Sequence, residues 1–200
     1  QAIARVIWSW VLYKNGLTKN IIYSGGAVHT PYNEARVMGL YAEQLGIPKE
    51  NILISATHTH SAPDAYGFPD ESGKSLADLK YLNWCAQQIA DAVNEASAKA
   101  VPSVLKIAVG EAEGKIAYNY YADKLYDPRC GVIQAISETG ADKGKVIATL
   151  VNYAIHPEVL GSSQGILSPD LCGPLYDRIE SKVGGVALFI NGAQGGMVTA

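Results

Sequence analysis

The stretch Val146–Pro157 reads VIATLVNYAIHP, and its apolar part, Val146–Ile155, predicts a strand that ends at a histidine followed by proline. A second apolar run, Val186–Ile190 (VALFI), predicts another buried strand. The segment between them, Leu171–Val183, has the pattern of a helix. Strands that alternate with helices are typical of α/β proteins. We therefore expect an α/β fold with a mixed, largely parallel sheet flanked by helices in a single domain.

Further elements are predicted on the N-terminal side of this stretch. Their ranges, taken from apolar patterns and from turn signals, are the strands Asn20–Ser24, Asn51–Ser55, Val104–Val109 and Val132–Ser137 and the helices Arg5–Lys14, Asn33–Leu45 and Leu76–Ala100. We expect the first two strands to be parallel neighbours joined by the second helix. A right-handed βαβ crossover is the ordinary structure for that pattern.

Composition indicates a packed globular protein. Of the 200 residues 48% are hydrophobic and 18% charged, and the formal net charge of −3 is spread without long runs of one sign. This charge pattern gives no sign of a nucleic-acid partner or of attraction to an anionic membrane surface. The three cysteines have no CxxC spacing, so the sequence indicates neither a disulfide framework nor a thiolate zinc site, and one disulfide stays open. The N-terminal residues resemble neither a membrane span nor a clean signal peptide.

All four histidines, His29, His58, His60 and His156, follow closely after a predicted strand. The glycine-rich segment Asn191–Gly196 has the equivalent place after the last strand. Ligands bind outside the carboxyl ends of strands in open α/β sheets. A binding site is therefore expected at this edge of the sheet.

The sharpest local signal is Thr57–Ser61, which reads THTHS. If the chain stays extended there, alternation places both imidazoles on one face, where they could bind one metal, or one could bind while the other donates to substrate. A pair of surface histidines is about as plausible for an isolated motif, because two ligands make no catalytic zinc site. His156 is the candidate partner, although alone it would more often be a core residue. We expect His58, His60 and His156 to converge, with His58 and His156 close enough to share a metal.

Four strings together resemble the neutral/alkaline non-lysosomal ceramidase family. In chain order they are NILISATHTHSAP (51–63), NYAIHPEVLG (152–161), LSPDLCGPLYDRIE (167–180) and ALFINGAQGGMVT (187–199). The resemblance covers residues 50–200 and implies the first part of that family's catalytic domain. It implies a zinc-dependent amidase that cleaves the N-acyl bond of ceramide into sphingosine and a fatty acid.

The resemblance also implies roles for single residues. His58 and His156 correspond to Zn²⁺ ligands, and His60 to a catalytic or substrate-binding group beside them. The remaining positions match the family's hydroxyl nucleophile, its substrate-binding asparagine and its glycine loop, whose backbone amides could steady an oxyanion; these are Thr199, Asn119, Gly195 and Gly196. The family's other ligands, a glutamate and a tyrosine, lie beyond residue 200, and the arginine that follows the family's asparagine is replaced by Tyr120. We therefore expect little or no ceramidase activity from this chain alone.

The partners follow from the same resemblance. It implies a ceramide-like lipid substrate, peripheral membrane contact through that substrate and a secreted or periplasmic location, and it leaves the oligomeric state open. Residues 1–50 resemble instead a SanA-like α/β domain of the bacterial envelope. In that interpretation the residues lining a small-molecule or phosphate site are Ser24, Gly25, Gly26 and Glu34. A tight glycine turn with a solvated glutamate is the commoner explanation.

Several alternatives stay open. The chain could be a metal-dependent hydrolase of another amide or ester, or a non-catalytic, chimeric ligand-binding domain. Asp170 could orient a ligand histidine, but an aspartate after proline and before a helix is more often an N-cap. Tyrosines at positions 118, 120, 121 and 126 could form the floor of a lipid pocket or pack at a sheet edge.

Overall fold

The structure, a computed structural model, describes residues 55–63, 69–76, 78–114, 116–161 and 163–199. The chain forms two compact units. Residues 63–100 belong to the first, and its long helix α3 spans Leu79–Ala98. The Asp78 carboxylate accepts hydrogen bonds from the amides of Lys80 and Tyr81, which satisfies donors that the first helical turn leaves unpaired. The helix predicted over Leu76–Ala100 is thereby confirmed.

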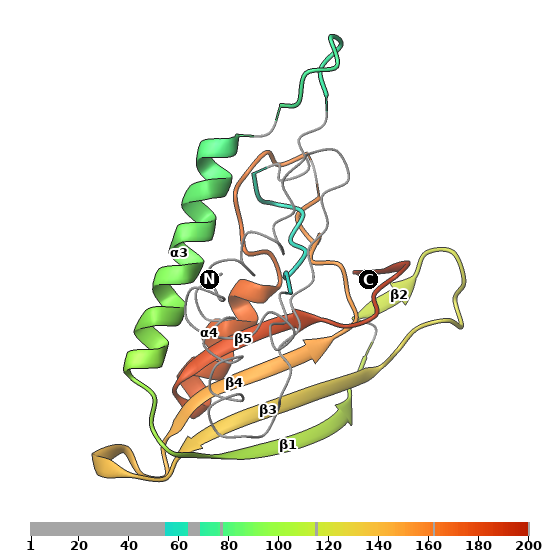
Figure 1. Ribbon diagram of the computed structural model, residues 1–200. Helices are drawn as coiled ribbons and strands as arrows, with labels where there is room; N and C mark the ends of the chain where they lie inside the picture. The colour runs from blue at the N-terminus through green and yellow to red at the C-terminus, as the bar shows by residue number, and fades with distance from the viewer. Residues whose placement is uncertain (1–54, 64–68, 77, 115, 162, 200) are drawn as a thin grey trace. The chain divides into compact units, whose positions relative to one another are not determined.

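The second unit contains residues 57–62 and 101–200, and its described part is built on a mixed sheet (Figure 1). Four described strands follow the order β1-β3-β4-β5; their bounds are Ser103–Glu111 for β1, Arg129–Ser137 for β3, Val146–Tyr153 for β4 and Val186–Asn191 for β5. β1 pairs with β3 and β3 with β4 in antiparallel fashion, whereas β4 and β5 are parallel. The expected mixed α/β fold is confirmed.

Parallel pairing has a smaller share in this sheet than the sequence suggested. β3 and β4 are joined by a short connection around the 3-10 turn Gly140–Asp142, which is too short for a crossover and makes the strands antiparallel. The connection from β4 to β5 contains the helix α4 (Cys172–Val183) and permits a parallel pair. The expectation of further parallel strands rested on residues 20–24 and 51–55, of which only Ser55 is described, and it is not in a strand.

The core of the second unit lies between α4 and one face of β4 and β5 (Figure 1). Alternation along the strands places Val151 and Tyr153 of β4 beside Ala187 and Phe189 of β5 on that face. Phe189 is 1% exposed, and burial of such a side chain contributes about 1.5–3 kcal/mol. This core holds the carboxyl ends of β4 and β5 together.

A small sheet adjoins this core and was not predicted. β2 (Ala117–Asn119) and β6 (Met197–Thr199) form an antiparallel pair of three residues each. Ala117 and Met197 are buried members of the same apolar core. Strands of three residues are too short to show an alternation pattern, which is why the sequence did not indicate them.

The remaining predicted elements are confirmed or lie outside the described residues. The strands and helix predicted over 104–109, 132–137, 146–155, 171–183 and 186–190 are present with ends shifted by at most three residues. The predictions over residues 1–54, including the domain boundary near residue 50 and the site at Ser24, Gly25, Gly26 and Glu34, lie outside the described part. No disulfide joins the three cysteines. Among the described helices, none has the length and apolar character that crossing a membrane requires.

Candidate metal centre

Three histidines from two distant segments meet within the second unit. His58 and His60 lie on the segment 57–62, and His156 lies just beyond the end of β4. One ring nitrogen from each lies within 4.8 Å of the others. The ring centroids are 4.9 Å apart for His58 and His60, 4.9 Å for His58 and His156, and 5.5 Å for His60 and His156. The predicted convergence of these side chains is confirmed.

The expected alternation of His58 and His60 along an extended segment is wrong, whereas His156 does follow the end of a strand. Residues 55–59 belong to no strand, and His58 has a left-handed backbone with φ of 62°. Strand alternation therefore does not place His58 and His60 on one face. Non-glycine residues with positive φ are uncommon and concentrate at functional sites, where the surrounding structure holds them. Among the described residues the only other one is Asp170, with φ of 52°.

Long-range hydrogen bonds hold the segment 57–62 in place. They join it to the turn after β4, to the residues before α4 and to the end of β5: the His60 amide donates to Pro157 O at 3.0 Å, the Thr59 hydroxyl to Ser168 O at 3.1 Å, the Ser168 amide to Ser61 O at 2.8 Å and the Asn191 side chain to Thr57 O at 2.6 Å. Each bond fixes the backbone on one side of His58 or His60. The histidine pair is thus positioned by tertiary contacts.

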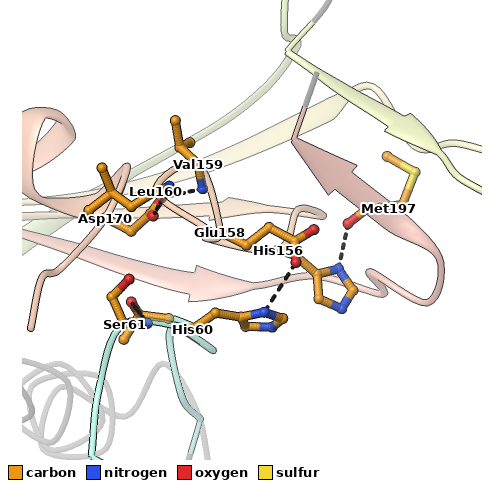
Figure 2. Close-up of polar contacts among 9 residues, drawn as sticks. His60, Ser61, His156, Glu158, Val159, Leu160, Asp170 and Met197 are labelled. Atoms are coloured by element: carbon orange, nitrogen blue, oxygen red, sulfur yellow. Dashed lines mark hydrogen bonds and ion pairs between the residues drawn. The ribbon is translucent and has the colours of Figure 1, made fainter. Parts of the chain in front are cut away.

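Two of the three rings also have their Nδ1 atoms engaged. The Nδ1–H of His156 donates to the carbonyl of Met197, and the backbone amide of His156 donates to the same oxygen at 3.0 Å (Figure 2). His60 Nδ1 lies 3.1 Å from the Glu158 carboxylate (Figure 2). A hydrogen bond at one ring nitrogen selects the tautomer and leaves the other nitrogen as an acceptor. Nε2 is therefore the nitrogen that His60 and His156 can offer to a ligand.

The charge state of the site favours metal binding. Burial lowers the pKa of His58 below its usual value, and the neighbouring His156 and then His60 lower it further. A neutral imidazole is the form that binds metal. In a tetrahedral zinc site with Zn–N distances of about 2.0–2.1 Å the nitrogens stand roughly 3.4 Å apart. The three nitrogens lie within 4.8 Å of one another, which is not far above that spacing. The donor set therefore fits zinc, although imidazole also suits copper, nickel and iron.

The glycine loop after β5 lies against the turn that leads to His156. A Cβ on Gly192 would lie 3.3 Å from the Cβ of Ala154, a tight contact, so glycine eases the close approach of the two segments. The amides of Gly192, Gln194 and Met197 donate within this region, whereas those of Gly195 and Gly196 donate to no other described residue. These two amides keep their predicted role as candidate oxyanion donors.

One polar group in this loop was not singled out from the sequence. The Oε1 atom of Gln194 is buried and has no hydrogen-bond partner among the described residues. Buried polar atoms are almost always paired with protein or water. An unpaired acceptor beside the carboxyl ends of parallel strands is compatible with a ligand at this edge. Glutamine in a loop gives no sequence signal for such a role.

The two other predicted residues lie in the small sheet and the turn after it. Asn119 ends β2, and its side chain accepts from the amides of Tyr121 and Ala122 and donates to Leu125 O at 2.7 Å. Its amide group thus organises the turn 120–125, where Tyr120 and Tyr121 are exposed. Substrate binding by Asn119 stays a prediction.

Thr199 lies in β6 opposite Ala117. Alternation along this short strand places it on the same face as Met197, whose side chain is buried in the apolar core. Its predicted part as the attacking hydroxyl stays a prediction.

Asp170 differs from both roles that the sequence suggested. Its carboxylate is 5% exposed and accepts from the amides of Val159 and Leu160, each at 3.1 Å (Figure 2). It also accepts from the amide of Leu171. It is not the N-cap of α4, which is Leu171, and it bonds to no histidine among the described residues. Asp170 instead holds the turn that follows His156.

The fold is similar to that of solved neutral ceramidase structures. One is a neutral ceramidase from Pseudomonas aeruginosa, with 20% identity, a TM-score of 0.65 and coverage of 83% of this chain and 29% of that chain. A second is a ceramidase complexed with C2, with 23% identity, a TM-score of 0.67 and coverage of 83% of this chain and 28% of that chain. At this identity the similarity concerns the fold. The resemblance drawn from the four motifs is confirmed at that level.

The chain spans less than a third of the length of these two structures. No protein-family profile and no curated protein matches its sequence.

Proposed function

We propose that the chain is part of a zinc-dependent amidase of the neutral ceramidase type, which hydrolyses the N-acyl bond of a ceramide-like lipid. The observation that carries the proposal is the group His58, His60 and His156 in a fold similar to that of neutral ceramidases. Neither feature would be sufficient alone, because histidine clusters occur in many proteins and one fold hosts many functions. Together they support a metal-dependent hydrolase.

The chemistry assigns separate tasks to the metal and to the chain. His58 and His156 would hold zinc, which when bound polarises an amide carbonyl and acidifies a water molecule or hydroxyl group. Gly195 and Gly196 would direct their backbone amides at the oxygen on which negative charge develops. Hydrolysis adds the hydroxyl group of water to the acyl carbon, breaks the C–N bond and delivers a proton to the leaving amine.

Two alternatives are separated from this proposal by substrate choice and by metal content. One is a metal-dependent hydrolase of another amide or ester, which would bind zinc equally well. The other is a non-catalytic domain that binds a ligand. In both cases the histidine group would be present, so the histidines alone do not distinguish them.

The experiment begins with zinc content after equilibrium dialysis. We expect one zinc per chain, lost in His58→Ala and in His156→Ala. The zinc-loaded protein is then tested with a fluorescent N-acyl sphingosine, a simple acyl amide and an acyl ester, and Thr199→Ala serves as a further variant. Preferential, though slow, cleavage of the N-acyl sphingosine supports the proposal, and preference for another substrate supports the second hydrolase. Absence of zinc from the dialysed native chain would refute the proposed zinc-dependent function.

A further inference from the structure

A group of exposed apolar side chains follows β2. Residues 120–126, which we call the apolar turn, read YYADKLY. Four of these seven side chains are aromatic or aliphatic and at least half exposed: Tyr120 at 68%, Tyr121 at 86%, Leu125 at 69% and Tyr126 at 50%. The loop from β2 to β3, which contains the turn, extends beyond the ends of both strands (Figure 1). One exposed apolar side chain is ordinary, whereas a contiguous group marks an interaction site.

The backbone of the apolar turn is fixed by Asn119. Its side-chain oxygen accepts from the amides of Tyr121 and Ala122 at 2.9 and 3.0 Å, and its NH₂ group donates to Leu125 O at 2.7 Å. The Leu125 amide also donates to Ala122 O at 2.8 Å. Because these bonds order the turn in the free protein, a partner does not have to restrain its backbone. The exposed side chains therefore stand on a preformed scaffold.

Contacts with the glycine loop join the apolar turn to the candidate metal centre. The Tyr120 amide donates to Gly196 O at 3.0 Å, and a Cβ on Gly196 would lie 2.9 Å from Cδ2 of Tyr121. The next residue, Met197, accepts with its carbonyl oxygen from the His156 amide at 3.0 Å and from His156 Nδ1–H. The apolar turn thus contacts the residue before the one that holds a predicted zinc ligand.

The charges around the apolar turn balance. Between residues 119 and 129, Asp123 and Asp127 are matched by Lys124 and Arg129. The Arg129 guanidinium donates to the Asp127 carboxylate at 2.8 and 2.7 Å. A surface without net charge has no attraction for anionic lipid, so its apolar groups decide what it contacts. Tyrosine prefers the boundary between hydrocarbon and water, where the ring is buried and the hydroxyl group stays hydrated.

We infer that the apolar turn docks on a neutral phospholipid bilayer and brings the candidate metal centre to the membrane surface. This inference rests on the proposed function, whose lipid substrate resides in such a bilayer, and it names the surface that makes contact. Tyrosine is also common at protein interfaces. The bilayer is favoured because the turn is attached to the loop beside the site, where a docked membrane delivers an insoluble lipid without passage through water.

The first test is flotation of the metal-free chain with phosphatidylcholine vesicles. We expect the native chain to bind and Leu125→Ser to lower the partition coefficient about tenfold, because a leucine side chain no longer enters the interface. Ile107→Ser is the matched control, since Ile107 on β1 is 70% exposed and Leu125 is 69% exposed. It should leave binding within about twofold of native. Circular dichroism verifies that both variants are folded.

Lipid charge separates an apolar contact from an electrostatic one. Phosphatidylserine in the vesicles should not tighten binding, and high salt should not weaken it, because the turn has no net charge to be screened. Binding that required phosphatidylserine and disappeared in high salt would overturn the inference.

A tryptophan reports which part of the chain enters the bilayer. Leu125→Trp and Ile107→Trp are each compared with the native chain, which has three tryptophans. We expect lipids with brominated acyl chains to quench the added fluorescence of Leu125→Trp and not that of Ile107→Trp. Equal quenching of both, or quenching of neither, would contradict docking through the apolar turn.

The outcomes keep this inference apart from the proposed function. Vesicle binding needs no metal, so a native chain without zinc refutes the function while flotation still reports on the apolar turn. A zinc-loaded chain that cleaves the N-acyl sphingosine but does not float with vesicles refutes the docking alone, and the turn then fits a protein partner or the chain of one bound lipid. If Leu125→Ser and Ile107→Ser weaken flotation alike, the adhesion is unspecific and the inference is also refuted.

Discussion

Replacement of Asp170 tests how much of the stability depends on a single buried carboxylate. Two of its hydrogen bonds join the segment before α4 to the turn after His156, and hydrogen bonds to a charged group contribute about 1.5–3 kcal/mol each. Asparagine tolerates the left-handed backbone, so Asp170→Asn adds little strain. Asparagine replaces one of the two accepting oxygens with an NH2 group, however, so a backbone N–H that bonded to that oxygen loses its acceptor. We expect Asp170→Asn to lower the free energy of unfolding by about 2–3 kcal/mol.

Two further substitutions separate the carboxylate from the backbone. Asp170→Gly removes all hydrogen bonds to the carboxylate without backbone strain and should lower the free energy of unfolding by about 3–5 kcal/mol. Asp170→Ala removes the same bonds and adds a left-handed alanine, for roughly 1 kcal/mol more. The assay is urea unfolding of the metal-free protein, with Asp177→Asn, an exposed aspartate of α4, as the control of equal charge change. If Asp170→Asn lowered the free energy of unfolding by less than about 0.5 kcal/mol, the assigned role of these hydrogen bonds would be contradicted.

Three other predictions concern the core, a turn and the histidine group. Phe189→Ala should lower the free energy of unfolding by about 3–5 kcal/mol in the same urea assay, because the side chain is 1% exposed; a loss under about 1 kcal/mol would mean that the site is not packed as described. In thermal unfolding, Gly185→Ala should lower the stability of the protein several times more than Gly184→Ala does. Both glycines have positive φ, but only at Gly185 would a Cβ lie 2.6 Å from a backbone oxygen, that of Ile147; equal losses would contradict this contact. The lowered pKa of His58 means that the unfolded metal-free chain binds more protons than the folded one between the folded pKa and about 6.5. The contribution of His58 to stability is therefore complete above pH ~6.5 and falls as the pH drops through that window. Native protein should lose more stability than His58→Ala between these pH values, and parallel curves would refute the shift.

Local patterns in the sequence were sufficient for most of the described elements. The apolar runs of β4 and β5 and the helical pattern between them predicted two buried strands with a helix between them, because periodicity reports which face of an element is buried. The order of four motifs predicted a fold similar to that of neutral ceramidases, which the structural comparison confirms. The same patterns placed His58, His60 and His156 near strand ends, and these three do converge.

The details of the site depend on contacts between residues far apart in the chain. The bond from Thr59 to Ser168 spans 109 positions and that from Asn191 to Thr57 spans 134. Such bonds flank the left-handed His58, which no alternation rule predicts, and the contact of Glu158 with His60 likewise joins segments far apart in the chain. Asp170 shows the same limit, since its sequence context predicted an N-cap while its carboxylate binds the turn after His156. Periodicity encodes burial along one element, whereas the partner of a polar side chain is chosen by whichever donor or acceptor the folded chain brings within about 3 Å. The sequence by itself thus determined the elements and the residue types of the candidate metal centre, and only the tertiary structure decided that His60 and His156 engage their Nδ1 atoms.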